Sequence, residues 1–230
     1  MIRTYPLKHS INRGKQQKIT RVIKQYRHLA CQIAKVQWVE FFKNQRFNKD
    51  LDIKSLATPL SARYKQTCQY QVVGVLESFI SNRQNDFLGI VWRSNLDSKT
   101  KFELSYIANH KLWFCNNIQM PQGKSPAIEI GCQTIGLARA IFKHILKKHY
   151  RPNLCYCNLA LDNKVAKVQP REQSEKKHAK KFDYWITLST LEKGQPIVLP
   201  LLTNSFFESK NGKLKKFCQI NLKESGEIIT

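Results

Sequence analysis

Basic side chains without acidic neighbours dominate the start of the chain. They recur every three residues, at Lys15, Lys18, Arg21, Lys24 and Arg27. No acidic residue occurs before Glu40, so this stretch lacks the mixed charges of an ordinary solvated helix. Cations of this kind neutralise phosphates and release the counterions that surround a nucleic acid. We therefore predict that these side chains contact a phosphate backbone, with a solvated helix face as the alternative.

The composition of the whole chain points to the same partner. Its 230 residues contain 39 Lys and Arg against 16 Asp and Glu, which gives a formal net charge of +23. Like charges repel one another in a compact protein, and a polyanionic partner offsets that repulsion. Nucleic acid is the leading candidate, and an anionic membrane surface is the weaker alternative.

Neither export nor membrane insertion is expected. No stretch approaches the ~20 consecutive apolar residues of a membrane span, and the start MIRTYPLKHSINRGK lacks the apolar segment of a signal peptide. The seven cysteines do not show the spacing of a disulfide framework. We expect free thiols in a reducing, cytoplasmic compartment.

Aromatic residues are interleaved with the basic ones. Tyr5 lies close to Arg3, and Tyr64 lies next to Arg63, with Tyr70 in the same region. Such pairs can stack on bases while the cation binds phosphate. We predict base stacking for Tyr5 and Tyr64, although packing in a core is the more frequent role of any single tyrosine.

Residues for catalysis or metal binding do not form a recognisable set. Cys155 and Cys157 have no second pair of ligands, and alternation along a strand would place both on one buried face. A metal-dependent nuclease needs converging carboxylates, and Asp162 and Asp183 have no evident partners. Because no glycine run matches a phosphate loop, we expect no catalytic residue, no metal and no cofactor in this chain. A nuclease built from scattered acids remains a weaker alternative.

Hydrophobic periodicity predicts helices first and strands later. Apolar residues at steps of three and four indicate helices over residues 15–44, 61–83, 98–109 and 132–149. Residues 116–127, with two prolines and a glycine, are expected to form a loop. Short strands are expected over residues 2–10, 154–161, 164–169, 184–189, 196–199, 216–222 and 227–230.

These elements predict an α+β fold with an interrupted sheet. The regular spacing of the late strands favours a small antiparallel β-barrel, and the first strand is expected to join it. The division is then residues 1–14 as the first barrel strand, 15–151 as an inserted helical lobe and 152–230 as the remaining strands.

The order of elements resembles that of TnpB-like transposon nucleases and type V CRISPR effectors. The resemblance rests on MIRTYPLKHSINRGKQQKI, where a strand leads into a long basic helix, and on LSARYKQTCQYQVVGVLESFISNRQ, which resembles their second recognition helix. LALDNKVAKVQPREQ, FDYWITLST, GQPIVLPL and GKLKKFCQINL are similar to the strands of their wedge domain. In this family the wedge is an oligonucleotide-binding-like barrel interrupted by a helical recognition lobe.

The resemblance implies an RNA-guided DNA-binding module. Its partners would be a guide RNA and target DNA. The family's RuvC nuclease is absent from this chain, which would then be a fragment, one half of a split effector or a nuclease-less relative; Mg²⁺ is expected only where a RuvC-containing partner is present. The residues that resemble the family's reader of a short flanking DNA motif are Ser61, Arg63, Gln66, Thr67 and Tyr70. Arginine and glutamine pair with the edges of guanine and adenine, although the exposed face of an ordinary helix could carry the same residues.

Further backbone contacts are expected at both ends of the chain. They are Arg3, Lys8 and Arg13 near the first strand, and Lys210, Lys213, Lys215 and Lys216 around a predicted hairpin turn. The main alternative to guided binding is a general basic RNA- or DNA-binding protein without a guide.

Overall fold

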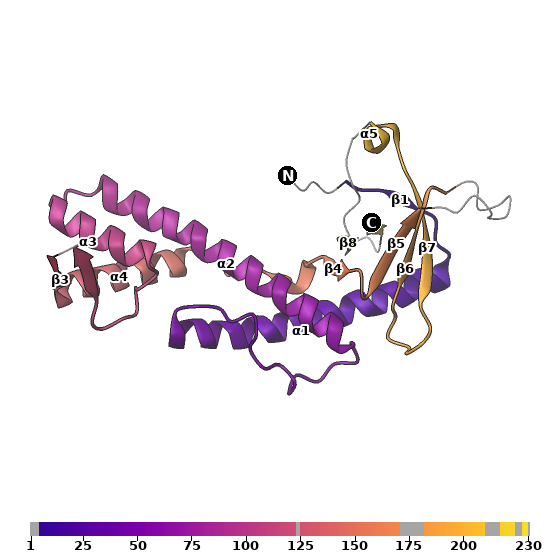
Figure 1. The fold of residues 1–230 in the computed structure, drawn as a ribbon, viewed down its shortest axis with the longest axis horizontal. Helices are drawn as coiled ribbons and strands as arrows, with labels where there is room; N and C mark the ends of the chain where they lie inside the picture. The colour runs from indigo at the N-terminus through magenta and orange to yellow at the C-terminus, as the bar shows by residue number, and fades with distance from the viewer. Residues whose placement is uncertain (1–4, 123–124, 171–181, 210–216, 224–226, 230) are drawn as a thin grey trace. The chain divides into compact units, whose positions relative to one another are not determined.

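The computed structural model describes residues 5–122, 125–170, 182–209, 217–223 and 227–229 (Figure 1). The chain forms two compact units, and the long helices α1 (Arg13–Asn44) and α2 (Ala62–Arg93) contribute to both. Unit 1 comprises residues 1–34, 50–72 and 153–230, and unit 2 comprises residues 35–49 and 73–152. This division differs from the expected one, because the first turns of both helices belong to the unit that carries most strands. Within the described ranges, no helix combines the length and the apolar character needed to cross a bilayer.

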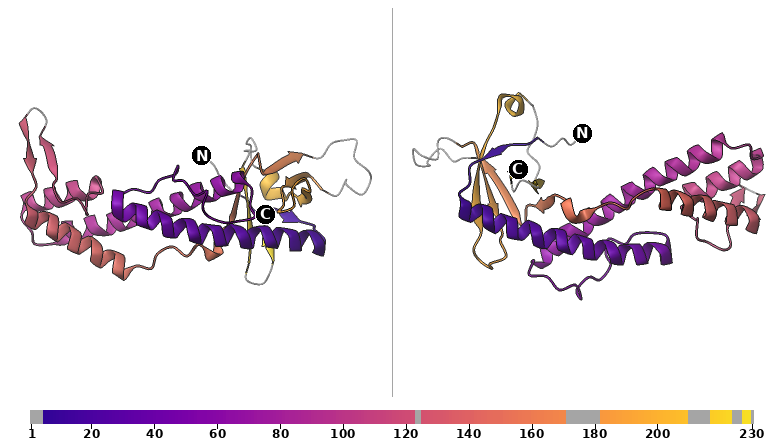
Figure 2. Two further views of the ribbon diagram at one scale, coloured as in Figure 1. Left: turned by 90° about the horizontal axis from the view of Figure 1, so that it is seen from below. Right: turned by 180° about the vertical axis from the view of Figure 1, so that it is seen from behind.

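Unit 1 contains a four-stranded antiparallel sheet. Its order is β1-β7-β6-β5, formed by β1 (Lys8–His9), β7 (Ile197–Leu202), β6 (Tyr184–Leu188) and β5 (Ala166–Pro170). Lys8 pairs with Leu202, so the first strand does join strands from the far end of the sequence, as predicted. The early part of α1 runs beside this sheet (Figures 1 and 2).

A second antiparallel sheet in unit 1 has the order β4-β8-β9. Its strands are β4 (Leu159–Asp162), β8 (Phe217–Leu222) and β9 (Ile228–Ile229). The mixed α+β class with antiparallel strands is therefore confirmed. The described strands do not close into one barrel, because their hydrogen bonds form separate ladders.

The core of unit 1 is the apolar stripe of α1 packed against the start of α2. Ile19, Ile23, Tyr26 and Ile33 are fully buried, at the steps of three, four and seven that place side chains on one helix face. The Tyr26 hydroxyl donates a 2.8 Å hydrogen bond to Gln71 of α2, so the buried phenol has a partner. Burial, the largest cause, raises the pKa of Tyr26 well above its usual value.

Unit 2 is mainly helical. It contains the ends of α1 and α2, α3 (Ser98–Asn109), α4 (Cys132–Lys148) and a hairpin of β2 (Gln119–Gln122) and β3 (Ser125–Glu129). Trp113 stacks on Phe142 with ring centroids 3.8 Å apart and planes at 1°.

A four-residue helix in unit 1, α5 (Ser205–Glu208), follows β7 of the four-stranded sheet and was not predicted.

Two expectations about unit 2 were wrong. Residues 116–127 are not a plain loop, because β2 pairs with β3 and buries Met120. Helix α2 continues ten residues beyond the predicted end at 83, to Arg93, because Phe87 and Val91 extend its buried stripe. The two prolines and the glycine of residues 116–127 are typical of a loop, so the hairpin was not predicted. The polar and charged residues after Arg83 indicated the end of the helix, so its continuation was not predicted.

Candidate nucleic-acid interface

The exposed cations of α1 lie on the side opposite its buried stripe. Arg13, Arg21 and Lys24 are exposed, and within the part of the chain that the structure describes their side chains have no hydrogen-bond or ion-pair partner. We call these three residues the basic strip. Eleven residues separate its ends, or about 16 Å along the helix axis at ~1.5 Å per residue. The strip therefore spans several phosphates of a nucleic-acid strand.

The other three cations predicted to contact phosphate, Lys15, Lys18 and Arg27, are engaged within unit 1. The Lys15 ammonium donates to the Val198 carbonyl at 2.7 Å, and Lys18 forms a 2.8 Å ion pair with Glu192. Arg27 donates to the carbonyls of Cys157 at 3.0 Å and Leu222 at 2.8 Å. The predicted phosphate contact of Arg27 is therefore corrected, because its guanidinium joins α1 to the second sheet.

Helix geometry explains this division. A step of three residues turns an α-helix by about 300°, so successive cations shift by roughly 60° around the axis. The run from Lys15 to Arg27 consequently sweeps about two thirds of a turn. Arg21 and Lys24 therefore face solvent, while Lys15 falls on the side of the buried stripe and Arg27 lies at its edge.

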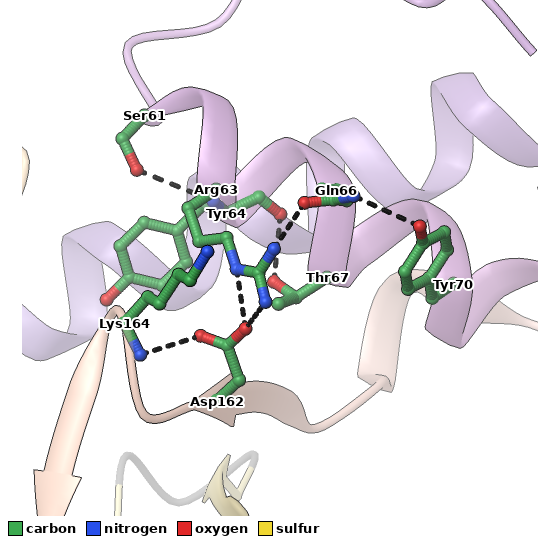
Figure 3. Close-up of polar contacts among 8 residues, drawn as sticks. All are labelled: Ser61, Arg63, Tyr64, Gln66, Thr67, Tyr70, Asp162 and Lys164. Atoms are coloured by element: carbon green, nitrogen blue, oxygen red, sulfur yellow. Dashed lines mark hydrogen bonds and ion pairs between the residues drawn. The ribbon is translucent and has the colours of Figure 1, made fainter. Parts of the chain in front are cut away.

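The start of α2 carries a connected set of polar side chains (Figure 3). Ser61 precedes the helix, and its hydroxyl accepts a 3.4 Å hydrogen bond from the Tyr64 backbone N–H, as an N-cap does. Arg63 forms an ion pair with Asp162 at the end of β4 and donates to the Gln66 side-chain oxygen. Gln66 in turn donates a 3.0 Å hydrogen bond to the Tyr70 hydroxyl. We call Arg63, Gln66, Tyr70 and Asp162 the polar cluster.

Asp162 holds Arg63 in place. Its second carboxylate oxygen accepts a 3.0 Å hydrogen bond from the Lys164 backbone N–H, which fixes the carboxylate (Figure 3). Burial acts to raise the pKa of Asp162, but the hydrogen bonds from Arg63 and Lys164 and the charge of Arg63 outweigh it and lower the pKa. The carboxylate thus stays ionised, and a guanidinium with a fixed partner loses little freedom when it meets a base.

Two of the predicted reading and stacking residues are buried instead. Thr67 is 8% exposed and donates its hydroxyl hydrogen to the Tyr64 carbonyl at 3.1 Å. Tyr64 is 1% exposed, and its hydroxyl donates to the Ser189 carbonyl at 2.8 Å. Both assignments are corrected, because neither side chain offers a free face to a base. Helical spacing places Tyr64 on the same buried face as Cys68.

The remaining predicted residues lie near the first strand or outside the described ranges. Tyr5 is half-buried and packs edge-on against Phe206, with centroids 5.5 Å apart, while Lys8 is exposed. Arg3, Lys210, Lys213, Lys215 and Lys216 lie outside the described residues.

Among the described residues of unit 1, acidic side chains pair with other cations or with hydrogen-bond donors, and none pairs with the basic strip. Asp162 pairs with Arg63, Glu192 with Lys18 and Glu227 with Lys223. Asp183 accepts hydrogen bonds from the Thr203 backbone N–H at 2.8 Å and from its hydroxyl at 2.9 Å. Asp162 and Asp183 therefore have separate structural partners, and in the described ranges no group of three or more His, Cys, Asp or Glu side chains could hold a metal ion.

The cysteines of the predicted strand after Pro152 are not on one buried face. Residues Leu154–Tyr156 form a short 3-10 turn, η1, and Asn153 caps it. Cys155 is exposed with its sulfur 3.3 Å from that of Cys31, whereas Cys157 is half-buried. Burial, only partly opposed by the charge of Arg27, raises the pKa of the Cys157 thiol to about 11.

Sequence reasoning missed the role of Asp162 in orienting Arg63. The two residues are 99 positions apart, and no local signal links them. The pairing of Lys15 with a β7 carbonyl was equally hidden, since a backbone acceptor has no sequence signature.

Comparisons with known proteins identify no relative: no family model, no curated protein and no solved structure matches this chain.

Proposed function

We propose that this chain is a nucleic-acid-binding module. The observation that carries the proposal is the basic strip, whose exposed cations have no partner among the described residues, while the described acids of unit 1 have other partners. A surface of one charge sign, uncompensated by the rest of its unit, attracts a polyanion over a distance of about a Debye length, ~8–10 Å. Phosphate backbones supply that charge with regular spacing.

The specific form of the proposal is RNA-guided DNA binding. Its support is the order of strand, helices and strands, together with the resemblance of the opening and of α2 to TnpB-like and type V CRISPR effectors. In this form the basic strip holds the backbone of a guide RNA or of the guide–target heteroduplex. Arg63 and Gln66 then approach base edges of flanking duplex DNA, oriented by Asp162. Cleavage, where it follows, belongs to a RuvC nuclease and its Mg²⁺ elsewhere.

Binding without a guide is the second candidate. The burial of Thr67 and Tyr64 favours it, because only Ser61, Arg63, Gln66 and Tyr70 of the proposed reader keep any access to solvent. A general binder needs the basic strip alone, and its affinity would depend on salt far more than on sequence.

Sequencing of the RNA that copurifies with the protein tests both forms. One abundant structured RNA with a variable end supports guided binding, and a broad unstructured population supports the general binder. If neither RNA nor DNA binds the purified chain at about 0.1 M salt, where phosphate contacts remain strong, the proposal is wrong. A variant with Arg13, Arg21 and Lys24 changed to glutamate provides the matched negative control.

A further inference from the structure

The end of α1 in unit 2 presents aromatic rings at the surface. Trp38 and Phe42 lie one turn apart and stack with centroids 5.8 Å apart and planes at 27°. Trp38 is only 6% exposed, whereas Phe42 is 43% exposed. Phe42 therefore extends the buried aromatic cluster out to solvent, where its ring can meet a ligand.

An arginine covers the same rings. The Arg151 guanidinium carbon lies 4.6 Å from the centroid of the Trp38 ring and 5.8 Å from that of Phe42. Arg151 is exposed, and among the described residues its guanidinium meets no carboxylate or carbonyl within hydrogen-bond distance. Stacking on the rings orients the planar cation, so its N–H groups have a fixed direction and no acceptor among the described residues.

The neighbouring residue is also left in solvent. Tyr150 is 98% exposed, more than any other large hydrophobic side chain of the described surface. Covering Trp38 accounts for Arg151, and Phe42 also packs against Phe114, but neither contact accounts for the exposed side of Phe42 or for Tyr150. We call Phe42, Tyr150 and Arg151 the aromatic platform.

Basic residues flank the platform along the chain. Lys43 and Arg46 follow Phe42 and are exposed, and Lys147 and Lys148 close the last turn of α4 just before Tyr150. No acidic residue occurs between Glu129 and Asp162 or between Glu40 and Asp50. A ligand that combines a flat ring with a phosphate would find aromatic side chains for its ring and basic side chains for its phosphate.

We propose that the aromatic platform binds an unpaired nucleotide of a single strand. The base stacks on Phe42, on Tyr150 or on the outer face of Arg151, and Lys43 and Arg46 hold the adjacent phosphates. A base inside a duplex is already stacked between its neighbours, so the platform discriminates single strands from duplexes. This inference rests on the proposed nucleic-acid binding and adds a second, chemically different site in unit 2.

Titrations of the full chain with a single-stranded RNA containing 2-aminopurine, and with a duplex of the same sequence, test the platform. Stacking quenches the fluorescence of this base analogue. Changing Phe42 and Tyr150 together to alanine should weaken single-strand binding by about tenfold and abolish the quenching. Duplex binding should change less than about twofold, since the phosphate contacts of the basic strip remain.

Two further variants separate stacking from charge and from folding. Arg151→Lys keeps the charge but loses the planar group, and should also weaken single-strand binding and reduce quenching. Tyr156→Ala removes a tyrosine of unit 1 that is 57% exposed, and should leave both titrations unchanged. Because Tyr150 is fully solvated, Tyr150→Ala alone should retain the wild-type melting temperature and still reduce quenching.

The outcomes distinguish the two proposals. If the wild-type chain binds single strands and the platform variants bind them equally well with equal quenching, the platform is wrong and the proposed function stands. If the wild-type chain binds neither single strands nor duplexes, the proposed function is wrong and the platform has no support.

Discussion

The basic strip of α1 and the polar cluster at the start of α2 belong to the same unit, but their cations are held differently. Arg13, Arg21 and Lys24 are exposed and have no partner in the described part of the chain, whereas Arg63 is held by Asp162 and Gln66. In the proposed function, the exposed cations attract a polyanion at long range and contribute little sequence specificity. The held arginine has a defined direction, and any ligand that takes it must compete with a carboxylate. In the function that we propose, affinity and selectivity therefore come from different helices.

The largest expected effect comes from reversing the basic strip. Changing Arg13, Arg21 and Lys24 together to glutamate should weaken binding to RNA and to duplex DNA by roughly 100-fold or more at ~0.1 M salt. The slope of log affinity against log salt should fall by about three, one for each lost phosphate contact. Thermal unfolding should change little, because exposed substitutions cost within about 0.5 kcal/mol.

A control variant tests whether the position of the three cations matters or only the net charge of the chain. The matched control reverses Lys54, Lys167 and Lys193, exposed lysines of the same unit. If both triple variants lose the same affinity and the same slope, net charge alone drives binding and the strip is not an interface.

A pair of arginine variants compares the free and the held cations of one helix. Arg27→Ala should lower the free energy of unfolding by about 2 kcal/mol, because carbonyl oxygens of Cys157 and Leu222 lose a charged donor. Arg21→Ala should leave stability within about 0.5 kcal/mol and weaken nucleic-acid binding instead. Urea unfolding and a binding titration of both proteins measure this. Equal stabilities would contradict the structural role of Arg27.

Removing the partner of Arg63 should have effects of opposite sign on folding and binding. Asp162→Asn should lower the free energy of unfolding by about 1 kcal/mol, because the ion pair is partly exposed. It should also tighten duplex binding by about two- to fivefold, since a carboxylate near the phosphates repels them. Asp183→Asn disturbs another carboxylate of the same unit and should not tighten binding. Weaker duplex binding by Asp162→Asn would show that Asp162 positions Arg63 more than it competes with the ligand.

The same ion pair should weaken in acid. Since the folded state lowers the pKa of Asp162, its contribution to stability is complete above the unfolded pKa of about 3.9. That contribution is lost as the pH falls through the lower folded pKa. The stability difference between the wild type and Asp162→Asn should therefore be constant above about pH 5 and shrink below pH 4. A difference that grows in acid would contradict the lowered pKa.

The smallest effect concerns a corrected residue. Thr67→Val removes a buried hydroxyl that donates to the Tyr64 carbonyl, and should cost about 1 kcal/mol of stability without changing affinity. Gln66→Ala, one position earlier and half-buried, should weaken duplex binding about threefold and alter its sequence preference. A loss of sequence preference in Thr67→Val would restore the original assignment.

Much of the fold was predictable because its signals are local. The stripe of Ile19, Ile23 and Tyr26 fixes the buried face of α1, and turn residues separate most of the late strands. The hairpin of β2 and β3 was not predicted because its prolines are typical of loops. The end of α2 escaped because Arg83 and the polar residues after it hid a stripe that resumes at Phe87.

The candidate site was predictable only in its residue types. Arg63 and Gln66 suit base edges wherever they lie, but Tyr64 and Thr67, each one position further along, turn into the core. The platform was missed for the converse reason: Phe42 and Arg151 are far apart in the sequence, and only folding places the guanidinium over the rings.

By itself the sequence determined the charge of this protein, the buried face of its first helix and the order of its elements, because composition and periodicity are properties of the chain. The tertiary structure decided which cations are available. Arg21 and Arg27 are the same residue type, six positions apart on one helix, yet only Arg27 meets the carbonyls of Cys157 and Leu222. Those acceptors come from residues more than a hundred positions away. A hydrogen bond across that distance depends on how sheets and helices pack, which no local pattern encodes.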